Sequence, residues 1–405
     1  MATPVDPRIQ KLSHALTVRT DCAPDDLDIE RSRLRAWQDA VTEWFPHVKR
    51  RLERTVLDEY GFFFRWDADR TGSENAAPLL LTAHYDVVPA PTDGWSVDPW
   101  AGAIRDNAVW GRGALDDKLS HIAILQAVEE LIAEGFKPKR PLYFAFGGDE
   151  ETGGRRGAAR IAATFRSMGL RFEATIDEGS AVVERIVPGI DDPIALIGCG
   201  EKGNLSVRLT VRGIGGHAAH PPHPDTATIF AGALSDVLRR RFPIRVTPTV
   251  SSFIRRLGTL TPGVSGAILR AYPLTAPLVN RLLSRQAETD AMIRSTRVVT
   301  MLGGSHAANV LPDALWATLN VRLVPGDTVQ ATLDRLRRCV GRRGADVTVA
   351  LEDVQDANDA PPESEAGGRW YDAVERSIRD VWGDVAVLPY LVTSTTDSRH
   401  YIAVS

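Results

Sequence analysis

The stretch from residue 80 to residue 86 reads LLTAHYD and joins a short apolar run to an imidazole and a carboxylate. Similar apolar runs at 142–146, 174–176 and 194–197 are separated by helical stretches, one of which spans 119–133. Apolar runs that alternate with helices in this way are typical of a sheet flanked by helices. We therefore predict an α/β core in this part of the chain.

Polar side chains directly follow three of these four runs. His84 and Asp86 follow the first run, Glu150 and Glu151 the second, and Asp177 the third. Because open α/β sheets bind ligands at the carboxyl ends of their strands, we expect these side chains to share one site. His84 and Asp86 are two residues apart, so an extended chain turns both to one face. We expect His84 to bind a metal and Asp86 to orient its imidazole.

The acidic residues at this edge indicate a divalent metal. Asp116 adds a carboxylate at the predicted start of the 119–133 helix. Taken singly, Asp116 is more often a helix cap, His84 a core or loop histidine, and Asp177 a turn residue. Together, so many converging carboxylates would repel one another unless cations neutralised them. An imidazole with several carboxylates suits zinc, manganese or cobalt, and a carboxylate that bridges two ions is typical of a two-metal hydrolytic site.

A series of motifs carries a resemblance to a known family. They read LTAHYDVVP (81–89), WGRGALDDK (110–118), GDEETGG (148–154), IDEG (176–179), GGH (215–217), NVLP (309–312) and TDSR (396–399). In this order they resemble the zinc-dependent aminoacylase and carboxypeptidase family, which includes N-acetylornithine deacetylase and succinyl-diaminopimelate desuccinylase. The form GALDDK and the helical insert that we expect over 251–300 most resemble its carboxypeptidase S-like branch.

The resemblance implies two zinc ions, with cobalt or manganese as alternatives. By the same resemblance, His84 and Asp177 would hold one ion, Glu151 would hold the other, and Asp116 would bridge both. Asp86 would orient His84.

The resemblance also implies which groups carry out the reaction. Glu150 matches the general base, and His217 matches a lid histidine that stabilises the oxyanion, often across a dimer interface. Asn309 and Arg322 match lid positions that contact substrate, and an arginine fork suits a free carboxylate. We expect hydrolysis of an amide bond next to a free carboxylate, in a short peptide or an N-acyl amino acid. An N-acetyl or N-succinyl amino acid deacylase is the alternative.

One position departs from the family pattern. The last zinc ligand of the family is a histidine beyond the TDSR motif, whereas this chain ends at Ser405. We expect a C-terminal truncation of the catalytic domain, with His400 as the candidate substitute ligand. A non-catalytic remnant that binds at most one metal is the alternative that this departure leaves open.

A change of periodicity after Gly203 predicts a second domain. Apolar residues alternate over 204–212, as in a strand with one solvated face. We predict that residues 1–202 and 356–405 form a zinc-peptidase-like catalytic domain, a mixed sheet flanked by helices. Residues 203–355 would form an inserted α+β lid. The family resemblance implies that the chain forms a homodimer through this lid.

The composition argues against several classes of partner. The chain has 48 basic and 52 acidic residues, a net charge of −4, so we expect binding neither to nucleic acid nor to a membrane. The three cysteines lack the spacing of a metal site, and the first residues lack the apolar core of a signal peptide. We therefore expect a cytoplasmic protein that acts on a small molecule or a short peptide.

Overall fold

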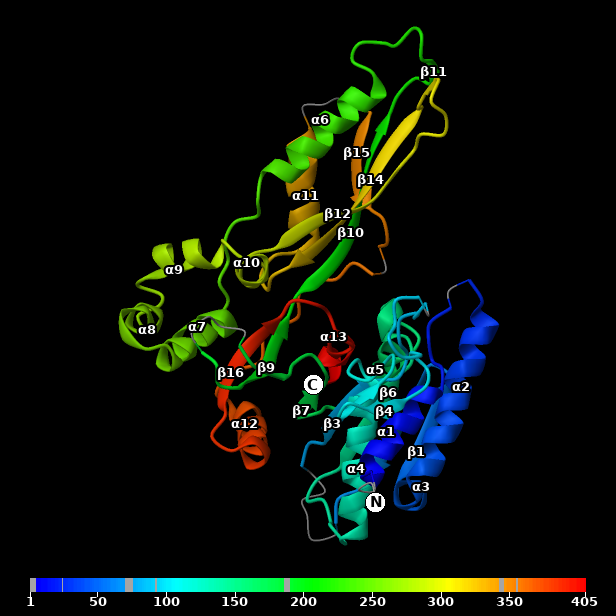
Figure 1. The fold of residues 1–405 in the computed structure, drawn as a ribbon, viewed down its shortest axis with the longest axis vertical. Coiled ribbons are helices and arrows are strands. Elements are labelled where there is room, and N and C mark those ends of the chain that lie inside the picture. The colour runs from blue at the N-terminus through cyan, green and yellow to red at the C-terminus, as the bar shows by residue number, and fades with distance from the viewer. Residues whose placement is uncertain are drawn as a thin grey trace. The chain divides into compact units, whose positions relative to one another are not determined.

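The computed structural model describes residues 5–23, 25–69, 76–91, 93–185, 190–341, 346–354 and 356–405. The chain divides into two compact units (Figure 1). The first contains Met1–Glu178 and Thr396–Ser405, and the second contains Gly179–Thr395. Each unit is described by itself.

The first unit is built on a five-stranded sheet in the order β1-β2-β6-β3-β7. The strands are β1 (Glu53–Asp58), β2 (Gly61–Trp66), β3 (Leu79–His84), β6 (Leu142–Gly147) and β7 (Ala174–Ile176). Strand β3, which lies between β6 and β7, is parallel to both, whereas β2 is antiparallel to its neighbours. This is the mixed sheet that the sequence predicts. A separate hairpin joins β4 (Ala103–Arg105) to β5 (Ala108–Trp110).

Helices cover both faces of this sheet because its strands are apolar on both sides. Phe62 and Phe64 of β2 pack in one cluster, whereas Phe63 between them packs in another. This alternation follows from the two-residue period of a strand. The first cluster includes side chains of α1 (Pro7–Thr17), α2 (Leu27–Trp44), α3 (Pro46–Arg51) and α4 (Lys118–Ala133). The second includes side chains of α5 (Ala158–Ser167) and, from α13 (Ser398–Tyr401), Tyr401.

The second unit contains an antiparallel sheet in the order β12-β14-β10-β15. Its strands are β10 (Gly203–Arg212), β12 (Thr296–Gly303), β14 (Ala314–Leu323) and β15 (Val347–Leu351). Alternate residues of β10, from Leu205 to Val211, are fully buried, as the sequence pattern predicts. They pack with side chains of the helices α6 (Thr226–Arg239) and α11 (Val329–Val340).

A smaller sheet in the second unit joins residues that are distant in sequence. Its strand β9 (Ile194–Glu201) lies between β16 (Ala386–Val392), which runs parallel to it, and β8 (Val182–Val183). The predicted domain boundaries, at 202/203 and 355/356, therefore differ from the unit boundaries at 178/179 and 395/396. Periodicity identifies β9 and β16 as strands but does not say which sheet they join. The division into catalytic and lid domains stays a prediction.

Helices complete the second unit. The helix α12 (Arg369–Trp382) contributes Tyr371 to a cluster with β9. The insert expected over 251–300 contains α7 (Pro248–Leu260), α8 (Gly263–Arg270), α9 (Ala276–Leu283) and α10 (Ala287–Ile293). These helices share a buried cluster with Leu388 and Leu391 of β16. In the described part of the chain, no helix has the length and apolar character needed to cross a bilayer.

Candidate metal centre

Three side chains that could bind a metal converge at the carboxyl end of β3. His84 is the last residue of β3, Asp116 lies just before α4, and Glu178 follows β7. The Nε2 atom of His84 lies 2.9 Å from Asp116 Oδ1 and 3.5 Å from Glu178 Oε1. One ligand atom from each residue lies within 4.8 Å of the others, and this is the one such group found among the described residues. His84 is buried while the Asp116 side chain is 66% exposed, so the cluster has a closed side and an open side.

Strand register explains why the acidic loop after β6 meets His84. In the parallel pairing of β3 with β6, His84 is level with Gly147. The loop that starts at Gly148 therefore leaves the sheet beside the imidazole. Its residues Glu150–Thr152 form a short 3-10 helix.

Asp86 connects the imidazole to this loop. Its backbone oxygen lies 3.0 Å from His84 Nδ1, and its Oδ1 atom lies 3.3 Å from the same nitrogen. The Asp86 carboxylate also accepts hydrogen bonds from the backbone N–H groups of Glu150, at 3.1 Å, and Glu151, at 3.0 Å. One buried side chain thus fixes the imidazole and the start of the loop together. The contact with Nδ1 is the geometry that the predicted orienting role requires.

The electrostatics of the cluster favour a bound cation. Burial raises the pKa of Glu150 to about 8 and that of Glu151 to about 7, and neighbouring carboxylates reinforce both shifts. Burial opposes protonation of His84, but its hydrogen bonds to Asp116, Asp86 and Glu178 raise its pKa well above the ordinary value. The metal-free site therefore favours extra protons, and a cation would supply the same compensation. One imidazole with several carboxylates is a donor set that fits zinc.

The structure differs from the sequence prediction in which acidic residue of the IDEG motif faces His84. Glu178, which the sequence analysis did not select, belongs to the His84 group. Asp177 instead accepts a hydrogen bond from the Glu178 N–H at 2.9 Å. Neighbouring side chains of an extended segment point in opposite directions, so only one of the two faces the imidazole in a given conformation. The role of Asp177 as a ligand stays a prediction.

The other predicted site residues of the second unit lie at two separate places. The pairing of β11 (Gly216–His217) with β13 (Val310–Leu311) sets His217 opposite Val310 and beside Asn309. Arg322 lies near the far end of β14, where its Nε donates to Asn320 Oδ1 at 3.1 Å. It is eight residues along the strand from Ala314, or about 27 Å at the usual rise. The second unit therefore does not bring Arg322 to His217.

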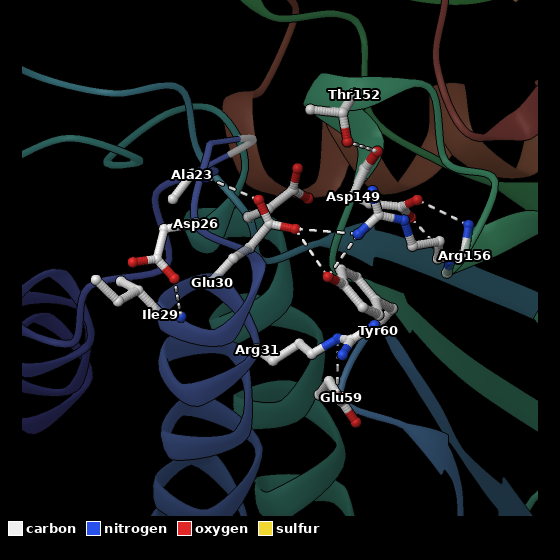
Figure 2. A network of polar contacts seen from close by, with 12 residues as sticks. Ala23, Asp26, Ile29, Glu30, Arg31, Glu59, Tyr60, Asp149, Thr152 and Arg156 are labelled. Carbon is white, nitrogen blue, oxygen red and sulfur yellow. Dashed lines mark hydrogen bonds and ion pairs between the residues drawn. The ribbon is translucent and has the colours of Figure 1, made fainter.

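A partly buried polar network, which the sequence analysis missed, supports the acidic loop (Figure 2). The Asp149 carboxylate accepts from the backbone N–H groups of Arg156 and Gly157 at 2.7 and 2.8 Å. The Arg156 side chain donates to Tyr60 Oη at 2.6 Å and to Glu30 Oε1 at 3.3 Å, and the Tyr60 hydroxyl donates to the same Glu30 oxygen at 2.8 Å. Glu30 is a buried residue of α2. The network thus joins α2 to both ends of the loop that carries Glu150 and Glu151.

Asp397 of the TDSR motif lies against the same loop. A Cβ atom added at Gly147 or Gly154 would stand 2.7 Å or 2.1 Å from its carboxylate oxygens, so both positions require glycine. Asp397 is buried, and burial with the nearby charge of Glu150 raises its pKa well above the ordinary value. The neighbouring His400 contacts the Gly153 carbonyl oxygen through Nε2 at 3.0 Å, and burial lowers its pKa to about 4. His400 is outside the His84 group.

The fold and this cluster define a metal-dependent hydrolase. A family model described as Peptidase family M20/M25/M40 matches residues 80–405, and the chain belongs to this family. It is therefore a metallohydrolase of the peptidase and amidohydrolase type, as the motifs predict.

The chain is similar to relatives of two kinds. It is 33% identical to the N-fatty-acyl-amino acid synthase/hydrolase PM20D1 of Xenopus tropicalis, over 91% of this chain and 71% of the relative. It is 32% identical to the probable carboxypeptidase S-like 2 of Dictyostelium discoideum, over 97% of this chain and 75% of the relative. The fold matches the M20 family metallo-carboxypeptidase Sso-CP2 of Sulfolobus solfataricus with a TM-score of 0.69 and 16% identity, covering 98% of this chain and 89% of that one. The predicted resemblance to the carboxypeptidase S-like branch is confirmed.

Proposed function

We propose that this M20 metallohydrolase cleaves the amide bond next to a free carboxylate in N-acyl amino acids and short peptides. The observation that carries the proposal is the group of His84, Asp116 and Glu178 with the Glu150 loop beside it. The relatives named for N-fatty-acyl amino acids and for carboxypeptidase activity support it. Both kinds of substrate present the same scissile unit, an amide nitrogen on a carbon that bears a carboxylate.

We propose two zinc ions as the resident metals. His84, Asp116 and an acidic residue of the IDEG motif would hold one ion, and Asp116 and Glu151 would hold the other. When bound, such ions polarise the scissile carbonyl and lower the pKa of a water molecule. The donor set supports this choice, since imidazole and carboxylate oxygens are the usual ligands of catalytic zinc.

Glu150 is the proposed proton carrier. Its half-buried carboxylate takes a proton from the attacking water and later delivers it to the leaving amine. A general base works best when its pKa is near the operating pH, and burial raises the pKa of Glu150 to about 8 in the metal-free protein. Nearby cations lower that pKa, which would leave Glu150 ionised and ready to accept a proton.

The substrate carboxylate is the proposed partner of Arg322, and His217 the proposed donor to the developing oxyanion. Because these residues are separated by about 27 Å of β14, one chain does not bring both to one substrate within its second unit. This separation supports a homodimer in which His217 of one chain completes the site of the other. The edge strand β12, which exposes Val298, Met301 and Leu302, offers a surface for such pairing.

The test compares wild type with Glu150→Gln and with Glu288→Gln, an exposed control on α10. Zinc-loaded enzyme is assayed on N-fatty-acyl, N-acetyl and N-succinyl amino acids and on dipeptides, each also as the carboxylate methyl ester. We expect Glu150→Gln to lower kcat at least about 100-fold at unchanged zinc content, and the esters to be poor substrates. Full activity of Glu150→Gln would refute its role as the proton carrier. Equal rates of amide cleavage in the methyl esters and in the free carboxylates would refute recognition of the carboxylate. Preference for the N-acetyl or N-succinyl compounds would establish the alternative deacylase.

A further inference from the structure

The helical insert carries an apolar surface that the proposed reaction does not use. We define the α8–α9 patch as the exposed side chains Val264, Leu274, Leu278 and Leu282 with Arg281 and Arg285, all from α8, α9 and the turn between them or the residues just after α9. Val264 is 77% exposed, Leu274 89%, and Leu278 and Leu282 48% each. Four large apolar side chains thus face solvent within twenty residues of sequence.

The helix α9 carries two neighbouring apolar rows. Leu278 and Leu282 are four residues apart and lie on one face, and Leu274 continues this row from the preceding turn. Val279 and Leu283 form the second row, about 100° around the helix from the first, and pack into the cluster shared with β16. Leu278 and Leu282 are not members of that cluster and stay 48% exposed. An apolar surface that extends beyond the buried row of a helix indicates a second apolar surrounding.

Two exposed arginines add positive charge to the patch. Residues 248–287 contain five arginines and neither aspartate nor glutamate, although Arg256 pairs with Glu375 and the exposed Glu288 follows the segment directly. Arg281 and Arg285 are exposed and follow Leu278 and Leu282 by three residues each, which places them beside the leucine row. Within the described residues, neither guanidinium forms an ion pair. The patch therefore combines an apolar row with unneutralised cations.

The helix α12 shows that this combination is not a general property of the surface. It also exposes large apolar side chains, Val381 at 79% and Trp382 at 58%. Its arginines, however, are interleaved with Asp372, Glu375 and Asp380. An anionic surface would gain little there because the acidic residues repel it.

We propose that the α8–α9 patch docks the enzyme on the surface of an anionic lipid bilayer. The leucines would enter the boundary between headgroups and acyl chains, and Arg281 and Arg285 would contact lipid phosphates. Helices with leucines on one face and arginines beside them bind membranes in this way, lying in the interface without spanning it. An anionic bilayer supplies an apolar layer that would accept the leucines and a dense negative charge that would attract the arginines.

The test is co-sedimentation of the zinc-loaded enzyme with phosphatidylcholine vesicles that contain or lack phosphatidylglycerol. Each arginine near an anionic surface is worth roughly a fivefold change in partitioning at low salt, so Arg281→Gln with Arg285→Gln should weaken binding roughly 25-fold. Leu278→Ser with Leu282→Ser should weaken it at least about tenfold. The α12 variants Val381→Ser and Arg376→Gln are matched controls and should bind as wild type does. Hydrolysis of a water-soluble N-acetyl amino acid checks that every variant is folded.

Three results would overturn the proposal. The first is equal binding of wild type to vesicles with and without phosphatidylglycerol, or no binding to either. The second is an equal loss of binding in the α12 controls. The third is that wild type does not bind vesicles and that Leu278→Ser with Leu282→Ser halves the molecular mass of the protein in solution. The patch would then contact a second copy of the chain.

Discussion

Replacing Asp86 with alanine should weaken metal binding and slow catalysis through one shared contact. The Asp86 carboxylate is the acceptor for the N–H groups of both Glu150 and Glu151, at 3.1 and 3.0 Å, and it also lies 3.3 Å from His84 Nδ1. Hydrogen bonds to a charged group contribute about 1.5–3 kcal/mol each, so Asp86→Ala removes about 3–6 kcal/mol of interactions that hold the loop on the imidazole. Groups that orient metal ligands typically change metal affinity or activity about 10–100-fold when they are removed. We expect an effect at the upper end of that range, because three site residues lose their common partner.

The assay is a zinc competition titration with a chromophoric chelator, followed by kcat and KM at saturating zinc. Asp327→Ala is a matched control, because Asp327 also accepts two hydrogen bonds, from Arg245 and Ser295, but lies in the second unit. Asp86→Asn should fall between Asp86→Ala and wild type, since its amide oxygen still accepts from one of the two N–H groups. If Asp86→Ala kept the zinc affinity and kcat of wild type, the loop would not depend on this carboxylate and the reasoning would be wrong.

Further predictions concern the loop network, a buried lysine and the metal. Glu30→Gln removes the charge that Arg156 contacts, so kcat should fall about tenfold with little change in KM. The control variant Glu43→Gln should have no effect. Equal activity of the two variants would contradict a role of Glu30 in supporting the loop. Lys202 is fully buried, and burial lowers its pKa from 10.5 to about 8. Below pH 8, Lys202 is charged in both states, and the cost of burying its charge lowers the free energy of unfolding in full. Between pH 8 and pH 10.5, Lys202 is neutral in the folded state but still charged in the unfolded chain, so the free energy of unfolding rises with pH. Lys202→Met should therefore raise the free energy of unfolding at pH 7 by up to about 3 kcal/mol, reduced by about 1 kcal/mol because the hydrogen bond to Arg294 O is lost. Urea unfolding at pH 10.5 should show no such gain. An equal gain at both pH values would exclude the lowered pKa of Lys202 as its cause. Zinc competes with protons for carboxylates such as Glu151, whose pKa is raised to about 7, so its apparent affinity should increase between about pH 6 and about pH 8. A titration that is flat over this range would show that the carboxylates do not take part.

The local structure could be predicted from the sequence because alternation and helical spacing are local signals. The alternate burial from Leu205 to Val211 is an example, since the period of two is visible in the sequence itself. The pairing of β9 with β16 could not be predicted in this way, because a parallel ladder links segments nearly 200 residues apart and leaves no periodic trace.

The site could be predicted to the level of the motif, and less well within it. The clusters after β3, β6 and β7 converge as expected, but which of Asp177 and Glu178 faces His84 depends on a backbone rotation that the motif does not encode. Glu30 and Arg156 were missed because their contact spans 126 residues of sequence and neither belongs to a motif.

The net charge of the whole chain and the charge of one segment lead to different expectations about membranes. The total of −4 predicts no membrane partner, and that prediction stands untested, whereas the segment 248–287 contains five arginines and no acidic residue. An average over 405 residues conceals a local field, because charges act over about one Debye length.

The discontinuous first unit bears on how the protein is made. Tyr401 and Val404 belong to a cluster with Phe63 and Phe165, the Phe172 N–H donates to Val404 O at 2.6 Å, and Asp397 lies against the loop that carries Glu150. A ribosome synthesises these partners only after it has completed residues 179–395. During synthesis the first unit would therefore lack part of its hydrophobic core until residues 396–405 are made, and its exposed apolar surface would be accessible to chaperones and proteases. The loop that carries Glu150 gains the contacts of Asp397 only afterwards, so we expect no hydrolytic activity from a growing chain that has not yet reached residue 404.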